Sequence, residues 1–115
     1  MDLSGHWSFF EHFDFGCDYG VAVLKQSGNT ITGTLVYTEL IFDEGEFIIS
    51  VEVKGSVFED RVTFECLSYQ FIDMEDEFEY YFDERSGTIV DYDRIEGISD
   101  DEQGIEGTFT MIRLL

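Results

Sequence analysis

The fold is decided by residues 46–54, which read EFIISVEVK and place apolar and polar side chains on opposite sides of an extended chain. Side chains along a β-strand alternate between two faces, so this stretch predicts a strand that buries one face and exposes the other. The predicted buried face carries Phe47, Ile49, Val51 and Val53, and the exposed face carries Ser50, Glu52 and Lys54.

The composition of the whole chain shows the same preference for strands. Its 115 residues include 12 Phe and 6 Tyr, many Val, Ile and Thr, and no Pro. Aromatic and β-branched side chains pack well on a pleated surface and lose rotamer freedom in a helix. The composition therefore predicts an all-β protein, and the length predicts one domain covering residues 1–115.

Turn signals divide the chain into eight strand-like runs. Residues that tolerate positive φ, such as Gly28 and Asn29, mark a reversal between two of these runs. Short links imply antiparallel neighbours, and closing the sheet on itself leaves no exposed edge. We therefore predict a single eight-stranded antiparallel up-and-down β-barrel. Its predicted strands are Gly5–Phe13, Tyr19–Gln26, Thr30–Thr38, Glu46–Phe58, Arg61–Phe71, Glu77–Asp83, Thr88–Ile98 and Ile105–Leu115.

Alternation within the other runs assigns further side chains to the barrel interior. A barrel of this size has room for its own side chains or for one small ligand. The predicted inward groups are Val21 with Val23, Ile31 with Leu35, Val62 with Phe64, Phe78 with Tyr80 and Phe82, and Phe109 with Met111.

Three features resemble the calycins, the superfamily that includes the lipocalins, the fatty-acid-binding proteins and the avidins. Gly5-His6-Trp7 resembles the Gly-x-Trp start of their first strand, residues 23–34 are similar to the second hairpin of avidin-like barrels, and Arg113 stands where calycins carry a basic residue on the last strand. The resemblance implies that Trp7 and Arg113 close one end of a barrel. Trp7 is the only Trp, whereas biotin-binding avidins use several, so biotin binding is not implied.

The charge of the chain is strongly unbalanced. Its 26 Asp and Glu against 6 Lys and Arg give a formal net charge of −20. Such a field attracts cations and basic surfaces and repels nucleic acid and anionic membranes, so we expect neither of the latter as a direct partner. Residues 1–5 lack the pattern of a signal peptide, and Cys17 and Cys66 are far apart, so we expect a cytoplasmic protein with free thiols.

Motifs for catalysis or cofactor binding are not apparent in the sequence. His6 and His12 have the same parity on one predicted strand, but a transition metal site needs three or four ligands. The segment Asp91–Gly97 begins like a calcium loop and then carries Ile95 and Glu96 where such a loop needs an oxygen ligand and a Gly. We therefore predict a protein without catalytic residues, resident metal or cofactor.

The leading functional hypothesis is a non-enzymatic, acidic inhibitor or immunity-type protein that binds a basic protein partner such as a nuclease-type toxin. Apolar anchors rimmed by acids suit such a face, because the anchors are desolvated and the charges steer the encounter. A contact between copies of a homo-oligomer is another reading of the same face. The predicted outward residues are Leu67, Tyr69 and Phe71 on one strand and Glu77, Glu79, Tyr81 and Asp83 on the next.

The alternative hypothesis is a carrier of a small apolar ligand, as the calycin resemblance suggests. The ligand would occupy the barrel interior, and the acidic residues would keep the protein in solution. The residues expected to line that pocket are Phe64, Tyr80 and Phe82.

Overall fold

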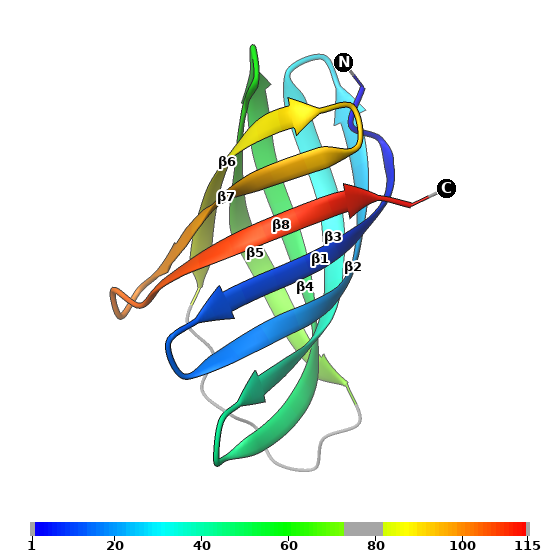
Figure 1. The fold of residues 1–115 in the computed structure, drawn as a ribbon. Helices are drawn as coiled ribbons and strands as arrows, with labels where there is room; N and C mark the ends of the chain where they lie inside the picture. Colours follow the sequence, from blue (N-terminus) through cyan, green and yellow to red (C-terminus); the bar gives the residue numbers. More distant parts are fainter. Residues whose placement is uncertain (1, 73–81, 115) are drawn as a thin grey trace.

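A computed structural model describes residues 2–72 and 82–114. Each strand pairs with the next in an antiparallel fashion, and β8 pairs with β1, so the sheet closes into a barrel (Figure 1). The predicted eight-stranded up-and-down barrel is confirmed. Among the described residues there is no helix long and apolar enough to cross a membrane. The strands are β1 (Gly5–Phe13), β2 (Gly16–Ser27), β3 (Thr30–Ile41), β4 (Gly45–Phe58), β5 (Arg61–Ile72), β6 (Asp83–Asp91), β7 (Arg94–Asp101) and β8 (Glu106–Arg113).

The sixth and seventh strands differ from their predicted positions. Most of the predicted strand Glu77–Asp83 lies outside the described residues, and its last residue is the first of β6. The predicted seventh strand, Thr88–Ile98, covers the end of β6, a turn and the start of β7. The reversal expected between the predicted strands Glu77–Asp83 and Thr88–Ile98 is therefore wrong, because Ser86 and Gly87 lie within β6.

Packing and turn chemistry explain this error. A Cβ on Gly87 would lie 3.0 Å from the Glu96 backbone oxygen and 3.1 Å from the Phe109 ring, so glycine suits close packing within the strand here and does not mark a turn. The actual turn follows Asp91, whose carboxylate accepts a hydrogen bond of 2.8 Å from the backbone N–H of Asp93. Such an Asx arrangement replaces a backbone turn bond.

The barrel core is made of the inward faces of the strands. The face predicted for residues 47–53 is confirmed, since Ile49 and Val51 are fully buried. The inward prediction for Val21 and Val23 is wrong, because these side chains are 41% and 44% exposed. Ala22 faces inward instead, directly opposite Trp7 on β1. The small methyl group leaves room for the indole, which the alternation pattern alone does not reveal.

One end of the barrel is closed by Trp7 and Arg113, the pair that the resemblance implies. The guanidinium of Arg113 lies 4.4 Å from the centroid of the Trp7 ring and donates hydrogen bonds to the backbone oxygens of Ser4 and Asp2. The Trp7 indole donates to the Leu3 oxygen at 2.9 Å. These bonds tie the N-terminal segment across the barrel end, so any opening for a ligand lies at the opposite end.

A β-bulge in β5 changes which side chains face inward. Val53 pairs with Cys66 and Glu52 pairs with Ser68, so Leu67 is an extra residue without a partner. Beyond the bulge, Tyr69 lies opposite Val51 and Phe71 opposite Ile49, and both of those partners face the core. Residues directly opposite each other share a face, so the predicted outward orientation is wrong for Phe71, which packs against the core. Tyr69 has the register of the same face but stays 39% exposed.

Candidate functional site

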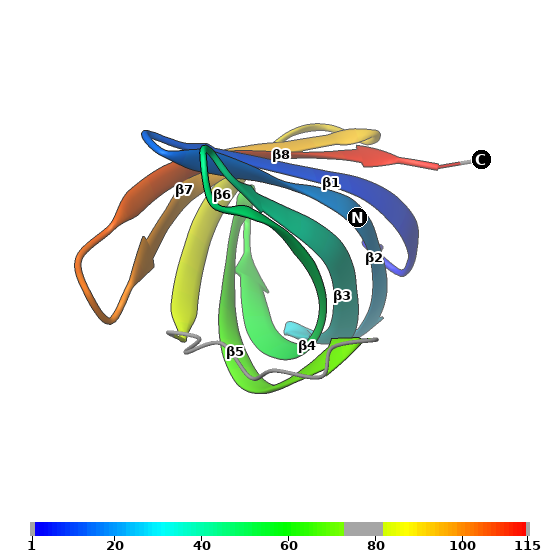
Figure 2. The same ribbon diagram turned by 90° about the horizontal axis from the view of Figure 1, so that it is seen from below.

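The candidate site lies at the barrel end that is opposite Trp7. Figure 2 views the barrel from the end that carries the site. The β1–β2, β3–β4 and β7–β8 connections meet there (Figure 1) and surround a cavity of about 410 Å³, which we call the mouth. The mouth is lined by Glu11, Phe13, Phe15, Glu39, Ile41, Phe42, Glu44, Phe47, Asp83, Ser99, Asp100, Asp101, Gln103, Ile105, Glu106 and Gly107.

A buried ion pair forms the inner floor of the mouth. Arg85 Nε donates to Glu11 Oε2 at 2.6 Å, and Arg85 Nη2 donates to Glu11 Oε1 at 3.3 Å and to Asp83 Oδ2 at 3.0 Å. Arg85 and Glu11 are each 3% exposed, and the guanidinium also lies 5.1 Å from the centroid of the Phe9 ring. An unpaired charge at such a depth would be strongly destabilising, so β1 and β6 are coupled across the barrel interior.

Three acidic side chains form a row across neighbouring strands. Glu11 on β1 lies opposite Asp18 on β2, which in turn lies opposite Glu39 on β3, so all three share the inner face. Burial raises the pKa of Asp18 well above its ordinary value, and the nearby charges of Glu39 and Glu11 raise it further. Burial also raises the pKa of Glu39. Asp18 is therefore protonated at neutral pH and serves as the hydrogen-bond donor to Glu39.

One atom of this row has no partner. Asp18 is 1% exposed, and its Oδ1 makes no hydrogen bond. Buried polar atoms are hydrogen-bonded in the great majority of folded proteins, and exceptions mark strain or a functional site. The row therefore offers a free acceptor beside the two cavity-lining carboxyls of Glu11 and Glu39.

Aromatic rings surround the acidic floor. Phe13 and Phe15 meet edge to face with centroids 4.9 Å apart, and Phe47 and Phe71 do so at 5.4 Å. Phe71 also contacts Tyr69 at 5.6 Å, which extends the ring cluster beyond the mouth. Large apolar faces at an opening are available for desolvation by a bound molecule.

Of the residues proposed from sequence as a partner-binding face, the four that the structure describes do not form one outer surface. Leu67 is 53% exposed at the bulge and Tyr69 is 39% exposed, whereas Phe71 packs against the core and Asp83 binds Arg85 at the floor of the mouth. The remaining residues of that prediction, Glu77, Glu79 and Tyr81, lie outside the described residues.

The residues predicted from sequence to line a small-ligand pocket are not brought together among the residues that the structure describes. Phe64 is 4% exposed within the core and does not line the mouth. Phe82 is 39% exposed and packs against Tyr69 at 5.7 Å. Tyr80 lies outside the described residues.

Sequence reasoning missed the residues that give the mouth its chemistry: Glu11, Asp18, Glu39 and Arg85. A signal for one of them was present, because Glu11 stands between Phe9 and Phe13 at an inward position of an otherwise apolar face. A charged residue at an inward position requires a partner, but alternation does not tell which distant strand supplies it.

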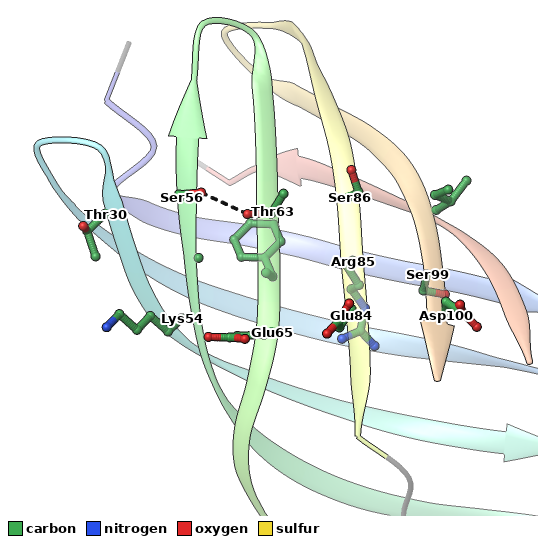
Figure 3. Close-up of a pocket in the computed structure, with 13 residues that line it drawn as sticks. Thr30, Lys54, Ser56, Thr63, Glu65, Glu84, Arg85, Ser86, Ser99 and Asp100 are labelled. Carbon is green, nitrogen blue, oxygen red and sulfur yellow. Dashed lines mark hydrogen bonds between the residues drawn. The ribbon is translucent and has the colours of Figure 1, made fainter. Parts of the chain in front are cut away.

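A second hollow lies on the outer wall over β4–β7 and has a volume of about 560 Å³ (Figure 3). Its outer lining is polar, and Ser56 Oγ and Thr63 Oγ1 are 3.1 Å apart within it. Exposed Lys54, Glu65 and Glu84 contribute both signs of charge. Phe64 is the only aromatic residue among the described residues that line this groove, whereas four Phe line the mouth, so we take the mouth as the candidate site. Among the described residues, no group of His, Cys, Asp and Glu is arranged to hold a metal ion.

Comparison with known proteins supports the fold. No protein-family model and no curated protein matches the sequence. A redesigned β-barrel, mFAP1, solved with DFHBI bound, has a TM-score of 0.74 at 16% identity over 96% of this chain and 94% of that chain. A de novo designed fluorescence-activating β-barrel has a TM-score of 0.73 at 16% identity over 97% of this chain and 94% of that chain. What these chains share is the barrel fold. A shared fold does not transfer a ligand or an activity.

Proposed function

We propose that the protein binds a small organic molecule in the mouth of its barrel and performs no chemical step on it. The observation that carries the proposal is the cavity of about 410 Å³ opposite the closed end. Ligand pockets span roughly 300–1,000 Å³ and combine apolar walls with a few convergent polar groups. The mouth has this composition, with Phe rings near the opening and the Arg85–Glu11 pair at the floor.

The architecture supports binding at this place. Arg113 and Trp7 close the other end, so a ligand enters and leaves on one side. The floor is held by the Arg85–Glu11 pair, whose side chains come from β6 and β1, two strands that are not neighbours in the barrel wall. Groups held in place before binding lose little entropy when a ligand arrives. Redesigned barrels of the same fold were solved with the small molecule DFHBI bound, which supports the proposal by analogy.

A matched pair of tryptophan substitutions tests the proposal. Ile41→Trp places a large ring in the mouth, whereas Val36→Trp places the same ring on the outer face of the same strand. A panel of fluorogenic dyes, including DFHBI, is titrated against wild type and both variants. We expect Ile41→Trp to weaken dye binding about tenfold or more, and Val36→Trp to leave it unchanged. Absence of binding by every dye, or equal binding by the three proteins, would overturn the proposal.

A second candidate function is binding of a basic protein partner, and a different outer surface favours it. A strip of apolar side chains crosses the outer wall of β8, β1, β2 and β3, and these side chains are between 40% and 48% exposed. Exposed apolar strips of this kind mark association surfaces. The net charge of −20 would steer a cationic partner towards the protein. The strip comprises Ile112, Phe10, Tyr19, Val21, Val23 and Val36.

This second candidate is tested by the combined substitution Val21→Ser and Val36→Ser. Binding to basic proteins is measured by calorimetry at low and moderate salt. We expect the double variant to lose binding and Val90→Ser, which changes an exposed valine on β6, to retain it. Binding that is insensitive to both salt and the strip would contradict this function.

A further inference from the structure

The charges around the mouth are of one sign. Seven of its 16 lining residues are Asp or Glu, and none of these described lining residues is Lys, Arg or His. The only guanidinium bordering the floor, among the described residues, belongs to Arg85 and is engaged by Glu11 and Asp83. Negative charge at the mouth therefore exceeds the positive charge that the described chain supplies.

The row of Glu11, Asp18 and Glu39 carries less negative charge than its three carboxyls could, because Asp18 holds a proton. Burial and the charges of Glu39 and Glu11 raise the pKa of Asp18, so that Asp18 is neutral at pH 7. Its Oδ1 remains a buried acceptor without a donor, on the inner face between two carboxyls that line the cavity. An arriving molecule with N–H donors and positive charge would supply what this row lacks, because such donors form strong charge-assisted hydrogen bonds with carboxylates.

The aromatic rings near the opening also favour a positively charged ligand. Phe13, Phe15, Phe42 and Phe47 line the mouth together with the acids, and Phe42 is 49% exposed. The face of an aromatic ring attracts a cation, and the attraction strengthens when the cation is desolvated. A bare metal ion would gain little from these apolar surfaces, whereas an organic cation with an apolar body would use both the rings and the carboxyls.

We infer that the ligand of the mouth is a small organic cation, a protonated or quaternary amine on an apolar body, held by Glu39, Glu11 and the surrounding Phe rings. This inference rests on the proposed function, because it names the class of molecule that the mouth accepts. The inner carboxyls hold the cationic group, and the rings near the opening cover the apolar body.

Two dyes that differ by one methyl group and one charge test the inference. The dimethylaminostyryl N-methylpyridinium dye is cationic, and its parent dimethylaminostyryl pyridine is neutral in mildly alkaline buffer. We expect the cationic dye to bind about tenfold more tightly or better, with an affinity that falls as NaCl screens the site. Equal affinity would overturn the cation assignment and leave the proposed function standing. Failure of both dyes, together with the panel used for the proposed function, would overturn both.

A matched pair of glutamate substitutions tests whether the preference for the cationic dye arises at the mouth. Glu39→Gln removes a carboxylate from the cavity lining, and Glu65→Gln removes the same charge from the exposed outer wall. We expect Glu39→Gln to weaken binding of the cationic dye at least about threefold more than binding of the neutral dye, and Glu65→Gln to change neither affinity. Equal effects of the two substitutions would show that the net charge of the protein, and not the mouth, selects the cation. Displacement of the dye by micromolar Ca²⁺ would overturn the assignment to an organic cation.

Discussion

Replacing Asp18 by Asn should stabilise the protein and flatten the dependence of its stability on pH. Asp18 is 1% exposed, and burial together with Glu39 and Glu11 raises its pKa well above neutrality. Folding at neutral pH therefore has to protonate a carboxyl that is ionised in the unfolded chain. Asn is neutral and keeps both the shape of the protonated side chain and its donor towards Glu39.

The magnitude follows from linkage between protonation and folding. An unfolded Asp has a pKa of about 3.9, so holding it protonated at pH 7 costs about 1.36 kcal/mol for each of roughly three pH units, or about 4 kcal/mol. Since the folded pKa is raised, the stabilising effect of the proton is complete below about pH 4 and is lost as pH rises towards the folded pKa. Asp18 and Glu39 titrate together, so we expect Asp18→Asn to gain roughly 2–4 kcal/mol at neutral pH.

Urea denaturation at several pH values between about 5 and 8, at constant ionic strength, measures this effect. Asp60→Asn on the exposed turn after β4 is the matched control, because it removes one acidic charge without affecting the barrel interior. Wild type should lose stability with rising pH more steeply than Asp18→Asn, and the control should follow wild type. An Asp18→Asn protein that is less stable than wild type at about pH 8, with the same pH slope, would refute the reasoning.

Three further outcomes follow from the same structure. Glu11→Gln leaves Arg85 buried without its main partner and should lower the free energy of unfolding by about 3–5 kcal/mol, whereas Glu96→Gln, in a half-exposed pair, should cost less than about 1 kcal/mol. Comparable losses in urea denaturation would contradict the role given to burial. The affinity of the cationic dye should rise as pH rises through the raised pKa of Glu39, since the ionised carboxyl attracts the cation. Dye titrations at several pH values measure this change. An affinity that does not vary with pH would argue against Glu39 as a ligand group. Moderate NaCl should raise the melting temperature by screening repulsion among the 26 acidic residues, and a melting temperature that ignores salt would show that this repulsion is weak.

The alternation of apolar and polar residues along the chain was sufficient to predict the barrel but not the residues of the mouth. Residues 46–54 alternate so regularly that the buried face of β4 followed from them. In β5 the same rule failed beyond Cys66, because the bulge at Leu67 inserts one residue and reverses every later side chain. A bulge depends on how two strands pair, so the alternation of one strand gives no sign of it.

Errors in the sixth and seventh strands have a related cause. Gly87 is a turn residue by local preference, but in the folded barrel it leaves space for the ring of Phe109, which is distant in sequence. Ala22, and not the larger Val21 or Val23, faces the interior because Trp7 lies opposite. In each case a bulky side chain on a nearby strand of the barrel wall occupies the space.

The amino-acid sequence by itself determined that this chain forms an antiparallel barrel, because period-two alternation and turn residues act between near neighbours and need no knowledge of the rest of the fold. The resemblance at Gly5-His6-Trp7 and Arg113 also indicated which residues meet at the closed end. Only the tertiary structure brought Glu11, Asp18, Glu39 and Arg85 together at the other end. Their meeting depends on strand register and barrel closure, which join residues up to 74 positions apart.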